Sequence, residues 1–358
     1  MACTSIQPIT STENPIRMVF GGDIVLGNSF VVENISKDWE ERYFSGVRSL
    51  LKRADLVFGN FEDTLTDQEK TTKTPSSGRA YAFRSPPHYA KLLFNEGFRV
   101  VNIANNHAND FGEPGYKDTL NFLTNAGIAV TGVKDEIALL NVRGLNIAFL
   151  GFTYLNRFNS VLDLEAGAER VRNAKAKGAY VIVTFHAGAE GPIAIWHGNE
   201  DEEYLGENRG NTVAFSRAMI DAGADIVVGH GPHVLRAIEC YQNKPIVYSL
   251  GNFVGVGGLS IKSLAAVSVL LDITVSTDGT LQTINLVPIR FNDQKLPRID
   301  AQEFGTRLVN YLGENARYAG TFLTFPTDHE FQMEFSNWLD LNMPQKLPEQ
   351  VTQTPARK

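Results

Sequence analysis

Ala-Asp-Ile-Val-Val-Gly-His-Gly-Pro-His-Val at residues 224–234 is the stretch that decides the predicted fold. Residues 226–228 form a β-branched apolar run, which is typical of a strand buried on both faces. Gly229 and Pro232 end that run, so His230 and His233 are expected in a turn at the carboxyl end of the strand. Ligands of open α/β sheets bind at that edge, and imidazole is the commonest metal ligand. The histidine pair can therefore serve one cation or two neighbouring ones; two ordinary surface histidines are the alternative.

Apolar strands alternate with helices through the first two thirds of the chain, which predicts an α/β fold. The expected strands cover residues 17–20, 56–58, 98–103, 145–152 and 179–185. From residue 236 on, strands joined by turns predict a second sheet packed against the first. We expect a flexible N-terminal lead at 1–15, a main domain at 16–295, a C-terminal helical extension at 296–342 and a disordered tail at 343–358.

The amino-acid composition of the chain limits the classes of protein to which it can belong. The 358 residues are 43% hydrophobic and 20% charged, as in an ordinary soluble globular protein. A formal net charge of −7 argues against a nucleic-acid partner, and two cysteines are too few for a disulfide framework or a cysteine-rich zinc site. Neither a signal peptide nor an apolar run of about 18 residues is visible, which predicts a cytoplasmic protein. A secreted or membrane-anchored protein trimmed of its anchor would look the same.

Successive strands end in residues with metal-ligand chemistry. The candidates are Asp23; Asn60 and Glu62; Asn106, His107 and Asp110; His186 and Glu190; and His230 and His233. A parallel sheet would bring all of them to one edge. Carboxylate, amide oxygen and imidazole together suit Mn²⁺, Fe²⁺ or Zn²⁺. Two such ions about 3.5–4 Å apart can clamp an in-line displacement at phosphorus, and a metal-bound water then supplies the nucleophile.

Each candidate taken alone also has an ordinary structural explanation. Asp23, Asn60 and Asn106 could stabilise turns through their own side chains. Asp110 could merely support its loop, and Glu190 could be an exposed loop carboxylate. The three histidines outside these motifs are expected at the surface: His88, His197 and His329. The joint occurrence at successive strand ends is what favours a site for a divalent metal.

The order of these motifs resembles the CapA family, which is linked to poly-γ-glutamate capsule synthesis and falls within the calcineurin-like metallophosphoesterase superfamily. The resemblance covers residues 16–255 and rests on six motifs. They are Gly-Gly-Asp at 21–23, Gly-Asn-Phe-Glu at 59–62, Asn-Asn-His-Ala-Asn-Asp-Phe-Gly at 105–112, His-Ala-Gly-Ala-Glu at 186–190, the stretch at 223–234 and Tyr-Ser-Leu-Gly-Asn-Phe at 248–253.

The resemblance implies a four-layer αββα sandwich with a dinuclear site at the strand ends. Asp23 would bind the first metal, Glu62 or Asn60 would lie in the bridging position, and Asn106 would bind the second metal. His107 would protonate the leaving oxygen beside Asp110, and the remaining ligands would be His186, His230 and His233. Weaker candidates for substrate binding are Glu190, Arg209 and Asn252.

Three positions depart from the superfamily and family patterns. Val25 stands where the superfamily has a histidine, Asn60 where it has an aspartate, and Gly231 where CapA sequences commonly have a histidine. The number of bound metal ions, one or two, therefore stays open.

Two functions follow from the motifs. The first is a metal-dependent hydrolase that cleaves a phosphoester or related bond in a small molecule or an anionic polymer. The alternative is a non-hydrolytic factor that binds poly-γ-glutamate or its membrane-associated synthase. Hydrolysis of the γ-glutamyl amide itself is a third idea, because a metal hydroxide can also attack a carbonyl.

Overall fold

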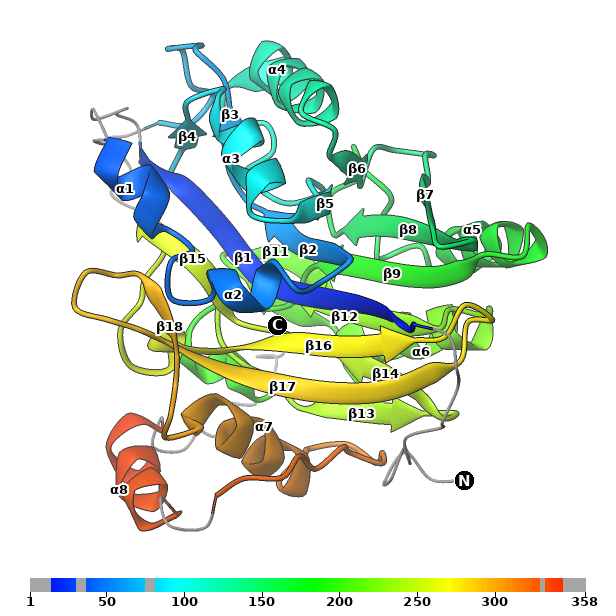
Figure 1. Ribbon diagram of the computed structural model, residues 1–358. Helices are drawn as coiled ribbons and strands as arrows, with labels where there is room; N and C mark the ends of the chain where they lie inside the picture. Colours follow the sequence, from blue (N-terminus) through cyan, green and yellow to red (C-terminus); the bar gives the residue numbers. More distant parts are fainter. Residues whose placement is uncertain (1–13, 30–36, 75–80, 329–331, 344–358) are drawn as a thin grey trace, which may run out of the picture.

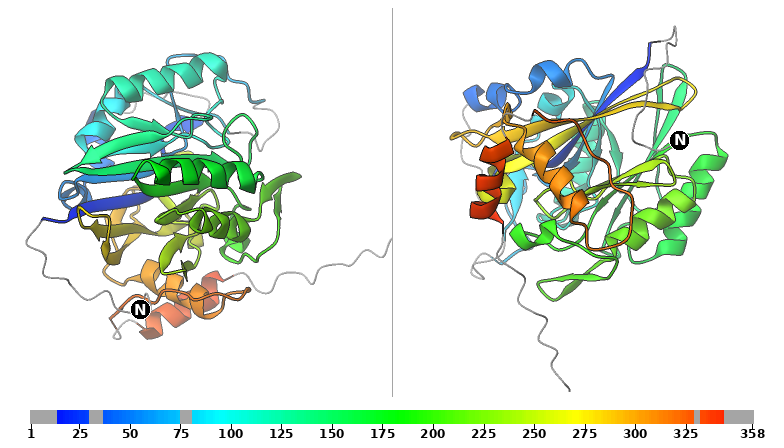
Figure 2. Two further views of the ribbon diagram at one scale, coloured as in Figure 1. Left: turned by 90° about the vertical axis from the view of Figure 1, so that its right-hand side faces the viewer. Right: turned by 90° about the horizontal axis from the view of Figure 1, so that it is seen from below.

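The computed structural model describes residues 14–29, 37–74, 81–328 and 332–343 as a four-layer αββα sandwich (Figure 1). Two β-sheets pack face to face, and helices cover the outer face of each sheet (Figure 2). The predicted α/β sandwich is therefore confirmed. No helix within the described ranges is both long and apolar enough to cross a membrane.

The larger sheet has ten strands and contains both the first and the last strands of the domain. Its central path runs in the order β18-β17-β16-β1-β2-β5-β6, and β15, β3 and β4 attach to the β1 side. These strands are β1 (Ile16–Ser29), β2 (Leu56–Phe61), β3 (Thr64–Leu65), β4 (Phe83–Ser85), β5 (Phe98–Asn102), β6 (Ala129–Thr131), β15 (Asn252–Gly257), β16 (Val267–Val275), β17 (Leu281–Phe291) and β18 (Pro297–Ile299).

The smaller sheet has six strands in the order β13-β14-β12-β9-β8-β7. They are β7 (Ala138–Val142), β8 (Leu145–Thr153), β9 (Tyr180–His186), β12 (Ile226–His230), β13 (Ile238–Tyr241) and β14 (Lys244–Val247). Every residue of β9 and β12 is buried, as their mainly apolar sequences predict. A separate hairpin, β10 (Glu202–Tyr204) and β11 (Glu207–Gly210), precedes β12 in the chain.

Three apolar clusters separate the four layers. One lies between the sheets, where Phe58 of β2 stacks on Phe149 of β8 with ring centroids 5.5 Å apart. A second packs the larger sheet against α2 (Arg48–Leu51), α3 (Tyr89–Asn95) and α4 (Gly112–Asn125). The third packs the smaller sheet against α5 (Leu164–Ala176) and α6 (Thr212–Asp221). The described part of the chain also contains α1 (Lys37–Arg42), α7 (Phe304–Glu314), α8 (Gln332–Asn342) and the short 3₁₀ turns Pro192–Ile195 and Ser263–Ala266.

The strands after residue 236 do not form a sheet of their own, so that part of the sequence prediction is wrong. β13 and β14 extend the smaller sheet, whereas β15 to β18 join the larger one beside β1. The first and second halves of the chain thus contribute to both sheets. The β13–β14 hairpin joins the smaller sheet through β14 beside β12, and the β16–β17 hairpin joins the larger sheet through β16 beside β1. β18 continues the larger sheet past residue 295, and α7 packs between β17 and β13.

We expect Phe58→Ala to lower the free energy of unfolding by about 3–5 kcal/mol, because the change leaves a cavity between the sheets. Phe58 is fully buried and also contacts Phe20 at 5.6 Å. Chemical denaturation of metal-free protein measures the loss. Leu139→Ala is the control, since Leu139 is 61% exposed and should change stability by less than about 0.5 kcal/mol. Equal effects of the two substitutions would contradict this account of the core.

Candidate metal centre and adjoining cavity

Two rows of polar residues, one across each sheet, form the base of the site. In the larger sheet, strand pairing places Asn252, Asp23, Asn60 and Asn102 side by side on β15, β1, β2 and β5. In the smaller sheet, pairing places His186 of β9 beside His230 of β12. All of these side chains are buried. The ligand candidates therefore come from facing edges of two sheets, not from one parallel sheet as the sequence suggested.

The turn after β12 places His233 between the two rows. Gly229 has no room for a side chain, because a Cβ atom there would lie 2.4 Å from the Phe185 ring and from the Tyr248 carbonyl oxygen. His233 itself has a φ of 59°, in the left-handed region that non-glycine residues rarely adopt. Strained backbone of this kind concentrates at functional sites. The predicted turn is present, and its conformation serves to direct the His233 ring.

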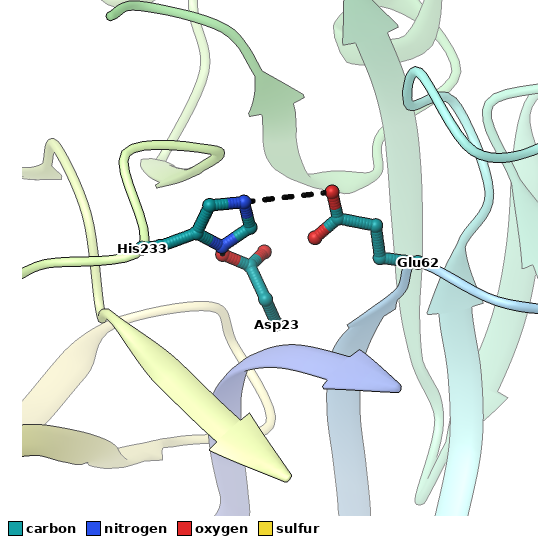
Figure 3. Close-up of side chains that lie close together, drawn as sticks. All are labelled: Asp23, Glu62 and His233. Atoms are coloured by element: carbon teal, nitrogen blue, oxygen red, sulfur yellow. Dashed lines mark ion pairs between the residues drawn. The ribbon is translucent and has the colours of Figure 1, made fainter. Parts of the chain in front are cut away.

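Asp23, Glu62 and His233 form a trio whose ligand atoms all lie within 4.8 Å of one another (Figure 3). His233 Nδ1 lies 3.0 Å from Asp23 Oδ2, and His233 Nε2 lies 3.7 Å from Glu62 Oε1. Asn252 Oδ1 accepts a hydrogen bond from His233 Nδ1 at 3.1 Å, which leaves Nε2 directed at Glu62. The trio thus offers two carboxylates and one imidazole to a single point.

His186 and His230 lie beside this trio. His186 Nε2 is 3.6 Å from Glu62 Oε1, and His230 Nδ1 is 3.7 Å from Asp23 Oδ1. These separations are too long for hydrogen bonds. Among the described residues, several buried ligand atoms have no hydrogen-bond partner: Asp23 Oδ2, both Glu62 oxygens, His186 Nε2 and both nitrogens of His230. Unpaired buried groups of this kind are costly, and a divalent cation of the Mn²⁺, Fe²⁺ or Zn²⁺ type would satisfy them. The residues present therefore fit a metal.

The charges of the trio shift its pKa values strongly. Burial raises the pKa of Asp23, but the close approach and charge of His233, whose Nδ1 lies 3.0 Å from Asp23 Oδ2, outweigh burial and leave the pKa below its usual range. Burial holds the pKa of Glu62 well above its usual range. Burial alone would lower the pKa of His233, yet the negative charges of Glu62 and Asp23 raise it to about 10. Without metal, these shifts favour a protonated His233 beside the Asp23 carboxylate.

Burial favours the neutral form of the two flanking histidines. Burial lowers the pKa of His230 to about 4 and that of His186 well below its ordinary value. Neutral imidazole is the form that binds metal. No proton therefore has to leave these two rings before a cation can bind.

Asn60 is held by its neighbours in the polar row. Its Oδ1 accepts a hydrogen bond from Asn102 Nδ2 at 2.8 Å, and its Nδ2 donates to Asp23 Oδ1 at 2.8 Å. Nδ2 also lies 3.0 Å from His186 Nδ1. In this arrangement Asn60 orients two ligand candidates. Asn102 was missed by the sequence analysis, although an asparagine at the end of an apolar strand was a usable signal.

His107 and Asp110 form a hydrogen-bonded pair at the edge of the site. His107 Nδ1 lies 2.7 Å from Asp110 Oδ2, which also accepts from the backbone N–H of Phe83. His107 Nε2 lies 3.9 Å from Glu62 Oε1. Asp110 thereby fixes the ring and leaves Nε2 facing the centre, which suits a group that transfers a proton.

A cavity of about 660 Å³ adjoins the centre at His107 and Glu190. Lys73, Arg157 and Arg209 line it together with tyrosine and asparagine side chains, including Asn106. Asn106 Oδ1 is buried without a hydrogen-bond partner among the described residues, and Asn106 is not a member of the trio. Glu190 and Arg209 also line this cavity, whereas Asn252 contacts His233 and the backbone of Ser260.

The three histidines outside the motifs differ in their positions. His88 is exposed, as expected. His197 is only 7% exposed and packs against Tyr248 and Tyr318, so the prediction of a surface position is wrong. A polar, acidic sequence around it concealed the aromatic cluster. His329 lies outside the described residues.

Known bacterial proteins resemble the chain over most of its length. It is 32% identical over 262 residues to the "PGA biosynthesis protein CapA" of Bacillus subtilis, and the aligned region covers 68% of this chain and 64% of that protein. It is 30% identical over 263 residues to the "Capsule biosynthesis protein CapA" of Bacillus anthracis, and the aligned region covers 70% of this chain and 62% of that protein. A "Probable polyglutamine synthesis accessory protein" of Mycobacterium tuberculosis is 26% identical over 344 residues, with 79% and 87% covered. The chain thus spans less than two thirds of the two Bacillus relatives.

The family model described as bacterial capsule synthesis protein PGA_cap matches residues 17–256. This range contains the trio, the flanking histidines, the His107–Asp110 pair and Arg209. Since the match covers well over half of the chain, the chain belongs to the PGA_cap family of bacterial capsule synthesis proteins.

Proposed function

We propose that this protein is a metal-dependent hydrolase that cleaves a phosphoester or a related bond. The observation that carries the proposal is the set of buried ligand atoms around Asp23, Glu62 and His233 that have no hydrogen-bond partner among the described residues. Family membership and the names of the relatives link the activity to poly-γ-glutamate capsule synthesis. The substrate would be a small molecule or an anionic polymer.

Each group of the site has a separate task in this proposal. Asp23, Glu62 and His233 would hold the cation, with His186 and His230 as further ligands if a second ion binds. When bound, the cation supplies a Lewis acid and activates water at neutral pH. His107, oriented by Asp110, gives a proton to the leaving oxygen from Nε2. The adjoining cavity receives the part of the substrate that leaves.

A second candidate is a non-hydrolytic factor that binds poly-γ-glutamate or its synthase. The relatives are named as biosynthesis or accessory proteins, which favours this alternative. In this chain Asn60 hydrogen-bonds to Asn102 and Asp23, which is a structural task. The two candidates differ in one measurable property, because only the hydrolase turns over a small ester.

Metal content and turnover test the hydrolase directly. We expect the protein loaded with Mn²⁺ or Zn²⁺ to hold metal by elemental analysis and to hydrolyse an aryl phosphate. His233→Gln should lower metal affinity by about 100-fold or more, since it removes one ligand of the trio. His88→Gln, the same change at an exposed histidine, is the control and should keep full affinity. Metal binding without turnover would instead support the binding factor.

The role of His107 predicts a dependence on the leaving group. We expect His107→Asn to lower kcat by about 10²–10⁴ for an alkyl phosphate, whose alkoxide needs a proton. The loss in kcat should be smaller for nitrophenyl phosphate, because its leaving group, nitrophenolate, departs without being protonated. Asp110→Asn should give the same pattern with a smaller loss, because the ring is misoriented but present. Equal losses for both substrates would contradict proton transfer by His107, as would loss of bound metal.

Metal affinity should rise with pH through the neutral range. The pKa of His233 is raised to about 10, so below that pH a cation must displace a proton from the ring. The pKa of Glu62, raised by burial, acts in the same direction. We expect affinity to rise by roughly tenfold per pH unit for each proton released. Titration calorimetry at pH 6 and pH 8, in buffers of different ionisation enthalpy, counts those protons. A pH-independent affinity would show that the trio does not hold the metal.

A further inference from the structure

We propose that Arg209 recognises an anionic group of the substrate in the adjoining cavity, and that Glu190 occupies the position of that group until the substrate binds. The ligand class is a carboxylate or a phosphate, which present the same oxyanion edge to a guanidinium. The inference rests on the proposed function, because it describes how the same site selects its substrate.

Arg209 is an arginine that has been taken out of water and fixed in orientation. It is 3% exposed, although it lines the cavity. Its guanidinium lies 4.2 Å from the centroid of the Tyr154 ring and 5.1 Å from that of Tyr204. Its Nε is buried and has no hydrogen-bond partner among the described residues. A desolvated guanidinium held against aromatic rings is well suited to bind an anion, since little side-chain freedom remains to be lost.

Glu190 links this arginine to the metal trio. Its Oε1 accepts a hydrogen bond from Arg209 Nη1 at 2.8 Å, and its Oε2 lies 3.9 Å from His233 Nε2. The carboxylate therefore lies between the guanidinium and the centre, where an anionic group next to the scissile bond would have to lie. An incoming anion of similar shape can take its place on Arg209 without leaving the guanidinium unpaired.

The side chain of Glu190 can move while its loop stays in place. The loop backbone is held by hydrogen bonds from Gly188 N to the Arg209 carbonyl oxygen and from Gly191 N to the Pro232 carbonyl oxygen, both 3.0 Å. Among the described residues, the side chain accepts a hydrogen bond from Arg209 and lies on the open cavity, and its 3.9 Å separation from His233 Nε2 is too long for a second hydrogen bond. Rotation about its own bonds is therefore sufficient to release the guanidinium.

Glu207 provides a comparison within the same cluster. It also pairs with Arg209, with 3.0 Å between Glu207 Oε2 and Arg209 Nη2. Its side chain is 49% exposed, against 16% for Glu190, so water screens this pair. Glu207 also accepts a hydrogen bond from Tyr154 and is thus tied to the rim. Removing its charge changes the net charge of the cavity by the same amount as removing that of Glu190.

The test measures anion binding to the metal-free chain of 358 residues, so that neither metal nor turnover enters the result. Inorganic phosphate and glutarate are titrated separately by calorimetry at constant ionic strength. We expect Glu190→Gln to lower the Kd by about tenfold, because the competing carboxylate is gone. Arg209→Lys should raise the Kd by about tenfold or more, since an ammonium cannot replace the guanidinium fork. Glu207→Gln should change the Kd by less than about twofold.

The opposite signs of these effects distinguish recognition from a structural role. An unchanged or raised Kd in Glu190→Gln would overturn the proposal, and so would equal tightening in Glu207→Gln, which would mean a general effect of charge. Wild-type affinity in Arg209→Lys would also overturn it. The tighter of the two probes assigns the group as phosphate or carboxylate. Circular dichroism confirms that each variant is folded.

The hydrolase and this inference can fail separately. If the metal-loaded protein turns over substrate but anion binding does not depend on Arg209, the inference is wrong and the proposed hydrolase activity is unaffected. Anion binding that depends on Arg209 and Glu190 without any turnover keeps the inference and favours a binding protein.

Discussion

The burial of carboxylates beside neutral histidines is the constraint on which this structure depends. Asp23 and Glu62 are fully buried, and taking an unpaired carboxylate out of water costs several kcal/mol. The fold tolerates this because strand pairing aligns a polar row along each sheet and the packing of the sheets brings the two rows together, with Asn60 Nδ2 3.0 Å from His186 Nδ1. The left-handed backbone at His233 then places a positive charge between the two acids. A cation and a proton on His233 are alternative ways to satisfy the same acceptors.

The cationic side chains that line the cavity beside the centre are also paired with carboxylates. Each of its cationic side chains already has a carboxylate partner: Lys73 with Asp110, Arg157 with Glu113, and Arg209 with Glu190 and Glu207. The formal net charge of −7 gives no general attraction for an anion. If Arg209 recognises an anionic ligand as proposed, the selection of that ligand would come from a local exchange of ion-pair partners, which depends on correct shape more than on charge alone.

Much of this arrangement could be predicted from the sequence because its determinants are local. The apolar runs before His186 and His230 predict buried strands, and Gly229 and Pro232 predict the turn that follows. What could not be predicted was which strand joins which sheet, because β15 pairs with β1 from the other end of the domain. The task of Asn60 depends on Asn102, a neighbour only through pairing of β2 with β5. Burial of His197 among tyrosines likewise depends on residues distant in sequence.

The position of the trio between two packed sheets has a consequence for the folding of the protein. Asp23 and Glu62 belong to the larger sheet and its loops, whereas His233 follows a strand of the smaller sheet. The trio therefore does not exist until the sheets have docked, and a cation bound there would be a reversible cross-link between them. Such a cross-link stabilises only the docked state, by an amount that grows with the free concentration of the ion. The resistance of this domain to unfolding would then vary with the supply of metal in its surroundings.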